Sequence, residues 1–207
     1  TFLSLGISFS AQATLVTPTN SIDGLNLSWN QSESNTLQTF DEQQNIKIKS
    51  NSVQVDYLVG TNLSTGQSFT GVNHSNSGLY LKEGTYSSHL LHFDPLGTNG
   101  GKAENIRIEF TDSIIAIVLG GEYLKLSDYL LGNANTSYES STSRRMETHD
   151  FFTLESSNTL LVDKIAVGLH WTDDARIITQ KVPEPSSWAL FGLGLLGLIG
   201  ARKITKN

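Results

Sequence analysis

Residues 114–119 read IIAIVL, six apolar residues in a row, and the chain then reaches the pair Gly120-Gly121. An apolar run of this length without alternation is typical of a strand that is covered on both faces. Residues 106–110, IRIEF, alternate instead, with Ile106, Ile108 and Phe110 expected to face inward. The two patterns together predict a sheet that has a covered strand near its centre.

Strand-like patterns recur along the rest of the chain, separated by turn residues. The further expected strands are residues 25–29, 46–49, 53–59, 68–70, 86–94, 150–154, 160–171 and 175–180. Between the second and third of these, Ser50-Asn51-Ser52 has the composition of a turn. The sequence therefore predicts that residues 46–49 and 53–59 form a hairpin.

Residues that favour the two ends of a helix occur together in one short stretch. Ser127 is suited to cap a helix, Asp128 favours the positive end of the helix dipole, and Gly132 suits the left-handed position after a helix. These residues predict a turn or two of helix over residues 128–131. Many short strands and almost no helix predict an all-β fold, namely an antiparallel β-sandwich of jelly-roll type, followed by a C-terminal single transmembrane helix.

The composition limits the classes of function. The 207 residues include no cysteine, so disulfides and thiol chemistry are excluded. The net charge of −6 argues against nucleic-acid binding, which requires a basic surface. Low charge together with abundant serine, threonine, asparagine and glycine fits an exported β-rich domain.

The first 13 residues have the pattern of the end of a secretory signal peptide. An apolar stretch leads to Ala11-Gln12-Ala13, in which Ala11 and Ala13 form a small-x-small cleavage site. The pattern predicts export through the Sec translocon and cleavage after Ala13 by signal peptidase; the alternative is a buried first strand. We therefore divide the chain into a signal peptide remnant (1–13), a β-sandwich ectodomain (14–181) and a C-terminal segment (182–207).

The C-terminal segment opens with residues 182–185, VPEP, which are Val182, Pro183, Glu184 and Pro185. Each proline fixes its own φ and favours extended geometry in the residue before it. The sequence therefore predicts a stiff, extended strip at this point.

An apolar, uncharged run follows at residues 188–201. It would form about 21 Å of helix, which is short for a hydrocarbon core of about 30 Å. Trp188 suits the interface between membrane and water, while Arg202 and Lys203 favour retention of the C-terminus on the cytoplasmic side. We expect a short transmembrane helix with the preceding domain on the exported side.

The proline-rich strip, the Trp-led apolar run and the basic end resemble the PEP-CTERM sorting signal of bacterial exosortase substrates. The resemblance implies a Gram-negative-type bacterium that makes exopolysaccharide, transient residence in the inner membrane and cleavage by an exosortase near residues 183–185. It also implies release to the cell surface or the extracellular matrix. The alternatives are an ordinary C-terminal anchor and a packed apolar helix of a soluble domain. Residues 92–95, HFDP, and 176–179, RIIT, resemble a recurring exosortase-sorted ectodomain that has no assigned activity.

Candidate metal ligands are His92, Asp94, Asp173 and Asp174. On a strand, His92 and Asp94 would share one face. We expect them to hydrogen-bond locally while Phe93 fills the core; the alternative is a metal site completed from elsewhere in the chain. Asp173 and Asp174 lie in an expected turn and offer oxygen ligands that suit Ca²⁺. No other cofactor is expected.

No catalytic residue is predicted. The chain contains neither G-x-S-x-G, which serine hydrolases use, nor the E-x-D-x-x-E strand of jelly-roll glucanases. We expect a non-catalytic, exopolysaccharide-associated protein that binds glycans through exposed aromatic side chains, the candidates being Tyr80, Tyr86, Tyr138 and Trp171. The alternatives are a polysaccharide-acting hydrolase, a calcium-dependent adhesion module and a purely structural matrix protein.

Overall fold

The computed structural model describes residues 21–72, 77–97 and 100–181. The predicted signal peptide remnant and the C-terminal segment with its predicted transmembrane helix lie outside these residues. Within the described ranges, no helix has both the length and the apolar content that a membrane span requires. The boundaries predicted for the three parts of the chain therefore stay predictions.

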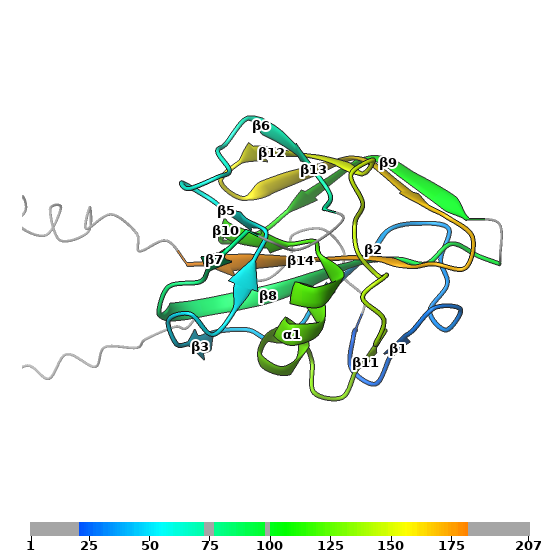
Figure 1. Ribbon diagram of the computed structural model, residues 1–207, viewed down its shortest axis with the longest axis horizontal. Coiled ribbons are helices and arrows are strands. Elements are labelled where there is room, and N and C mark those ends of the chain that lie inside the picture. Colours follow the sequence, from blue (N-terminus) through cyan, green and yellow to red (C-terminus); the bar gives the residue numbers. More distant parts are fainter. Residues whose placement is uncertain (1–20, 73–76, 98–99, 182–207) are drawn as a thin grey trace, which may run out of the picture.

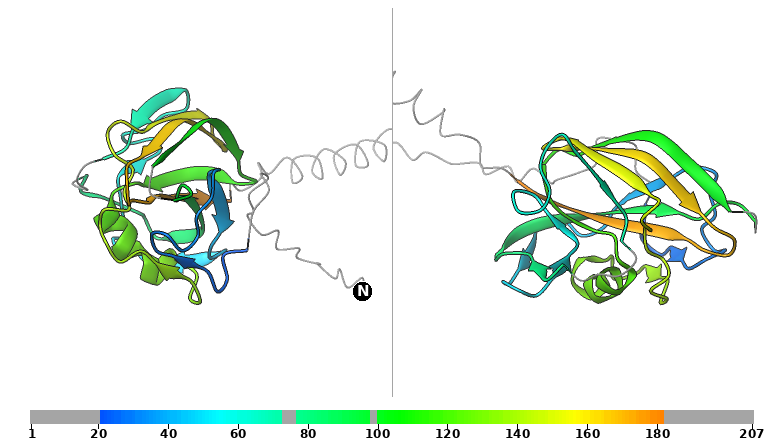
Figure 2. Two further views of the ribbon diagram at one scale, coloured as in Figure 1. Left: turned by 90° about the vertical axis from the view of Figure 1, so that its right-hand side faces the viewer. Right: turned by 45° about the horizontal axis from the view of Figure 1, so that its top comes forward.

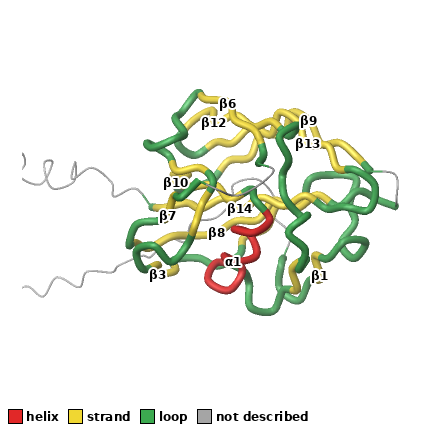
Figure 3. Tube along the Cα trace, viewed as in Figure 1, coloured by secondary structure: helices red, strands yellow, loops and turns green. Residues whose placement is uncertain are grey.

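The described residues form mostly strands, and Figure 3 shows one helix among them. The strands are β1 (Asn26–Leu27), β2 (Gln38–Asp41), β3 (Ile46–Ile48), β4 (Gln54–Val55), β5 (Tyr57–Leu58), β6 (Gln67–Thr70), β7 (Leu79–Tyr80), β8 (Gly84–Phe93), β9 (Gly101–Glu109), β10 (Ser113–Val118), β11 (Ser137–Tyr138), β12 (Phe151–Ser156), β13 (Thr159–Val167) and β14 (Asp173–Gln180). The helix is α1 (Gly121–Leu131).

Two antiparallel sheets stack as two layers (Figures 1 and 2). One has the strand order β2-β8-β14-β10-β5, with β3 also pairing with β8, and the other has the order β6-β12-β13-β9. Two small pairs, β1 with β11 and β4 with β7, lie outside these sheets. The predicted all-β class is confirmed, while the jelly-roll connectivity stays a prediction.

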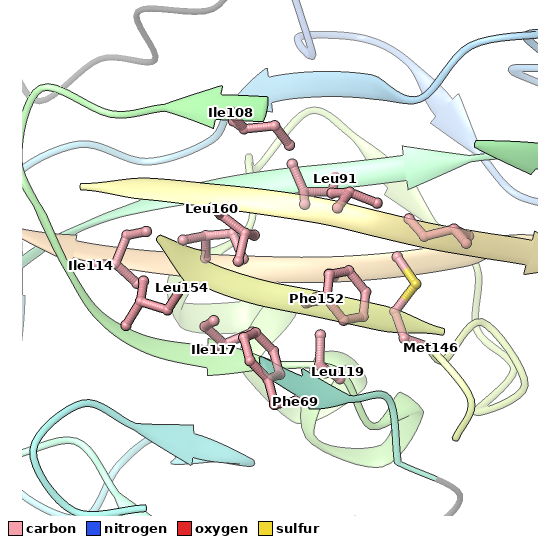
Figure 4. Packing of buried hydrophobic residues seen from close by; sticks show 14 of the residues in the cluster. Phe69, Leu91, Ile108, Ile114, Ile117, Leu119, Met146, Phe152, Leu154 and Leu160 are labelled. Atoms are coloured by element: carbon pink, nitrogen blue, oxygen red, sulfur yellow. The ribbon is translucent and has the colours of Figure 1, made fainter. Parts of the chain in front are cut away.

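Strand β10 is covered on both faces, as its unbroken apolar sequence predicted. Ile114 and Ile117 point into the core between the two sheets, where Figure 4 shows them beside side chains of the four-stranded sheet. Ala116 and Val118 point to the other face and belong to a second core. The pairing of β10 with β14 shifts in register between Ile114 and Ala116, so that Ile114 and Ile117 face one side of the sheet while Ala116 and Val118 face the other. One strand therefore contributes to both hydrophobic cores.

Helix α1 covers the outer face of the six-stranded sheet and is longer than the predicted helix over residues 128–131. Tyr123, Leu124 and Leu131 are buried against the second core. The packing of this apolar face explains why the helix begins seven residues earlier than its polar capping signals suggested.

The predicted end of this helix at Leu131, with Gly132 as its C-cap, is confirmed, but the predicted N-terminal cap and the left-handed conformation of Gly132 are wrong. Ser127 lies inside the helix, and its hydroxyl donates to the Leu124 carbonyl oxygen at 2.9 Å. Gly132 has φ −73° and is not left-handed. Gly120 is the N-cap, and a Cβ at Gly121 would collide with the carbonyl oxygen of Thr142. The glycine pair that ends β10 thus also lets the helix start against a neighbouring backbone.

The predicted hairpin between residues 46–49 and 53–59 is also wrong. β3 pairs with the first part of β8, β4 pairs with β7, and β5 pairs with β10. β8 is 10 residues long, and β2 and β3 line up end to end along one of its edges. Pairing with β8 adds β3 to a sheet of several strands, which is more stable than a hairpin of two short strands.

Arg176 connects the six-stranded sheet to α1. Its side chain points from the middle of β14 to the outer face and is completely buried. Nε and Nη2 donate to the two oxygens of Glu42, each at 2.7 Å, and Nη2 also donates to Asp128 at 2.9 Å. Nη1 donates to the Leu124 carbonyl oxygen and to the Ser127 hydroxyl. All five N–H groups of the guanidinium are therefore used.

The electrostatics of this contact keep Arg176 charged. Burial would lower the pKa of Arg176, but the charge and hydrogen bonds of Glu42 and the charge of Asp128 raise it overall. A buried charge with this many partners is costly to disturb, because its partners would stay buried without compensation.

We predict that Arg176→Met lowers the free energy of unfolding by about 3–5 kcal/mol, because it leaves the carboxylate of Glu42 buried and unpaired. Urea unfolding measures this change. Arg107→Met, at an exposed ion pair with Glu155, is the matched control and should leave the unfolding midpoint nearly unchanged. Equal midpoints for the two variants would contradict the role assigned to Arg176.

Candidate functional site

A small open pocket lies beside the start of β14. Its volume is about 210 Å³. Three separate segments form its wall: the turn after β1, the segment after β11 and the turn that leads into β14. The lining residues are Trp29, Glu139, Ser141, Ser143, Arg144, His170, Trp171 and Thr172. The pocket therefore depends on the folded arrangement of distant parts of the chain.

Aromatic rings form one side of this pocket. The side chain of Trp171 is 52% exposed although it is large and apolar. The Trp29 ring packs edge-on against the His170 ring, with centroids 5.2 Å apart and an interplanar angle of 80°. Exposed aromatic surface beside a pocket is typical of a binding site, because water contact with such a ring is otherwise unfavourable.

The turn that carries Trp171 has an unusual backbone. His170 adopts φ +62°, in the left-handed region that few non-glycine residues occupy. The sequence predicted that a strand would continue through residue 171, but β13 ends at Val167. Leu169, in the same turn, is 57% exposed. The left-handed residue helps to turn the chain and bring Trp171 to the pocket instead of the core.

The polar groups of the pocket are held by the protein itself. Glu139 accepts hydrogen bonds from the backbone N–H groups of Trp29 at 3.3 Å and Ser141 at 2.9 Å. The hydroxyls of Ser141 and Ser143 are hydrogen-bonded to each other. These contacts fix the segment after β11 against the turn after β1. The pocket is thus formed before any ligand binds.

Arg144 lies at the base of the pocket and is buried. Its guanidinium donates to Asp128 at 2.6 Å and to Asp174 at 3.3 Å, and it lies 5.5 Å from the centre of the Tyr138 ring. Its Nε has no hydrogen-bond partner among the described residues. Arg144 therefore connects the pocket to the ion pairs beneath α1.

His92 and Asp174 form a buried pair on the outer face of the six-stranded sheet. The His92 Nδ1 lies 2.7 Å from an Asp174 oxygen, and Thr172 Oγ1 lies 3.4 Å from the same nitrogen. Neither His92 nor Asp174 is exposed to solvent. The pair therefore stabilises the start of β14 rather than contacting a ligand directly.

The four metal candidates from the sequence do not meet in one place. Asp94 accepts a hydrogen bond from the Asn30 N–H at 2.8 Å, and burial raises its pKa. Asp173 is opposite Phe93 in the pairing with β8, whereas Asp174 is opposite His92. Neighbouring residues of a strand point to opposite faces, so Asp173 and Asp174 are separated by the sheet itself.

A different acidic group is present on the inner side. Asp173 meets Glu147 and Asp150, and one carboxylate oxygen of each lies within 4.8 Å of the others. Glu147 and Asp150 were not among the residues predicted from the sequence. The sequence signal for them was two acidic residues three positions apart in a turn. Such pairs are common in proteins and usually bind no ligand.

The four aromatic candidates have different surroundings. Tyr86 is buried, and the Tyr138 hydroxyl donates to Glu42 at 2.7 Å beneath the pocket. Tyr80 is 37% exposed but lies on β7, outside the pocket. Trp171 alone among the four lines the pocket, and Trp29, which the sequence analysis did not select, lies there as well.

Comparison with known proteins identifies one part of the chain. Residues 181–203 match the family model described as PEP-CTERM protein-sorting motif. No curated protein and no solved structure matches the chain. The chain therefore carries a PEP-CTERM sorting signal, which indicates an exported protein and supports an exosortase as a partner.

Proposed function

We propose that this protein is a non-catalytic component of the cell surface or extracellular matrix that binds a glycan in the pocket lined by Trp29 and Trp171. The half-exposed ring of Trp171 beside a preformed pocket is the observation that carries the proposal. Sugar rings have an apolar face that stacks on aromatic rings, and their hydroxyl groups hydrogen-bond at the edges.

The shape and polarity of the pocket support a sugar as the ligand. Trp29 and Trp171 offer apolar surface, while Glu139, Ser141 and Ser143 offer polar atoms on partly or fully exposed side chains. The volume of about 210 Å³ is smaller than that of pockets that enclose a drug-sized ligand, which fits a surface site for a short part of a longer chain. Such a site would hold a residue of a polysaccharide without enclosing the polymer.

The arrangement of acidic groups supports binding over catalysis. Glycoside hydrolysis requires two carboxyl groups about 5–10 Å apart on either side of the scissile bond. Among the described residues that line the pocket, Glu139 is the carboxylate, and it accepts backbone hydrogen bonds from Trp29 and Ser141. It is therefore placed as a structural acceptor at the wall of the pocket.

The proposed route to the cell surface follows from the two ends of the chain. The Sec translocon and signal peptidase process the N-terminal signal, and the segment from Trp188 to Arg202-Lys203 resides transiently in the inner membrane of a Gram-negative-type bacterium. An exosortase then cleaves near Glu184. The released domain associates with exopolysaccharide through the pocket lined by Trp29 and Trp171, which we call the tryptophan pocket.

We predict that Trp171→Ala weakens glycan binding by about 30-fold, the loss of about 2 kcal/mol that is typical when a central aromatic contact is removed. A glycan array selects the probe, and calorimetric titration measures the affinity. Tyr129→Ala, which removes an 89% exposed aromatic ring on α1, is the control and should bind as the wild type does.

Two results would count against the glycan proposal. One is an array without signal at high protein concentration, which would favour a purely structural matrix protein that self-associates without sugar specificity. The other is equal affinity for the Trp171→Ala variant and the wild type, which would place the glycan elsewhere. Because Trp171 is half exposed, its substitution should leave the melting temperature within a few degrees.

We predict that Glu184→Ala abolishes C-terminal processing, because the substitution removes the acidic residue between the two prolines of the sorting motif. Intact-mass analysis of the protein from wild-type and exosortase-deficient cells measures the outcome. Glu139→Ala, in the folded domain, is the control and should be processed normally. If the wild-type protein still ended at Asn207, the segment would act as a simple membrane anchor.

A further inference from the structure

We propose that Glu147, Asp150 and Asp173 bind a hard divalent cation, with Ca²⁺ as the preferred ion. The site lies at one end of the space between the two sheets and is separate from the tryptophan pocket. The inference does not depend on glycan binding, because it rests on the geometry and the hydrogen bonds of the three carboxylates.

Asp150 is the fixed member of the group. It is completely buried, and its two oxygens accept hydrogen bonds from the backbone N–H groups of Glu147 at 2.6 Å and Ala166 at 2.9 Å. The Asp150 N–H donates to the Glu147 carbonyl oxygen at 2.9 Å, which closes a turn between the two acidic residues. Asp150 is thereby attached to β13 of the four-stranded sheet.

Asp173 approaches from the other sheet, and one of its two oxygens lacks a hydrogen-bond partner among the described residues. It is the first residue of β14 and is 1% exposed, yet its Oδ2 has no hydrogen bond among the described residues. Burial raises the pKa of Asp173 well above its ordinary value, and the charges of Asp150, Glu147 and Asp174 raise it further, while the charge of Arg145 offsets only part of this. An unpartnered carboxylate oxygen at this depth is unfavourable unless a proton or a cation neutralises it.

Glu147 connects the group to solvent. Its side chain is 29% exposed, and its nearest positive groups are Arg145, with Nε at 3.9 Å, and His149, with Nε2 at 3.7 Å. Both distances are too long for hydrogen bonds. Arg145 and His149 are therefore long-range charge partners of Glu147 rather than hydrogen-bond donors, and the partly exposed side chain of Glu147 is where the group meets solvent.

The spacing and the donor type fit Ca²⁺. The three oxygens lie within 4.8 Å of one another, which is about twice a Ca²⁺–oxygen distance of 2.3–2.6 Å. Three carboxylates in a partly open site leave room for water ligands, which Ca²⁺ accepts in its coordination of six to eight oxygens. Zn²⁺ prefers nitrogen and sulfur ligands, and the group contains neither.

Metal binding can be tested with the full chain, purified in detergent and freed of metal with EDTA. Millimolar CaCl₂ should raise the melting temperature by about 3–6 °C, the shift expected when a ligand is present at about ten times its dissociation constant. The same shift should be absent with NaCl at equal ionic strength. The melting-temperature shifts measured with MgCl₂ and MnCl₂ show which of the three hard cations the protein prefers.

Two variants separate metal binding from a shared proton. Asp173→Asn removes the unpartnered charge, so it should keep or raise the melting temperature without metal and lose the response to Ca²⁺. Glu147→Gln, at a partly exposed position, should fold normally and reduce the response. Glu122→Gln on the exposed side of α1 is the matched control and should respond as the wild type does.

The proposal is overturned if none of the three divalent ions shifts the wild-type melting temperature, since the buried carboxylates would then be neutralised by a proton. It is equally overturned if Asp173→Asn keeps the full response to Ca²⁺. Because the readout is thermal stability, neither result depends on whether the tryptophan pocket binds a glycan.

Discussion

The bidentate pair between Arg176 and Glu42 is the contact on which the arrangement of the outer layer depends. The guanidinium also holds Asp128, Ser127 and the Leu124 carbonyl oxygen, so a single side chain connects the central strand β14, the segment after β2 and helix α1. A buried arginine with five satisfied donors sets position and direction in a way that apolar packing alone does not. The helix therefore has one position over the sheet.

The two faces of strand β14 carry different kinds of side chain. Arg176 and Asp174 point outward into the ion pairs beneath α1, while Ile177 and Ala175 point inward into the core between the sheets. Arg144 bridges Asp128 and Asp174, and so extends the same set of ion pairs to the base of the tryptophan pocket. The pocket wall and the helix are consequently supported by one connected group of buried charges.

Sequence patterns predicted the parts of the fold that depend on local alternation and on apolar content. The run at residues 114–119 identified a doubly covered strand because burial on both faces requires apolar residues at every position. The helix was too short in the prediction, since its start depends on the packing of its apolar face against the sheet and on the space for Gly121 beside Thr142, 21 residues later in the chain. The hairpin prediction failed because β8 is long enough to pair with both β2 and β3.

The candidate sites were harder to predict because their members are distant in sequence. Glu42 and Arg176 are 134 residues apart, and no local pattern relates them. The adjacent pair Asp173-Asp174 suggested a shared site, but alternation along a strand sends the two side chains to opposite faces. That rule was readable from the sequence once the pair was placed inside a strand rather than in a turn.

The position of β14 also has a mechanical consequence. The strand begins two residues after Trp171 and ends next to residue 181, where the sorting motif starts. If a polymer were held at the pocket before the proposed cleavage releases the domain, tension toward the C-terminal segment would act along β14 itself. Both points of attachment flank the same strand, so the covalent backbone of β14 would carry the load, and the ladders to β8 and β10 would not have to break. The connection between the pocket and the sorting motif thus runs through a strand that is paired on both sides.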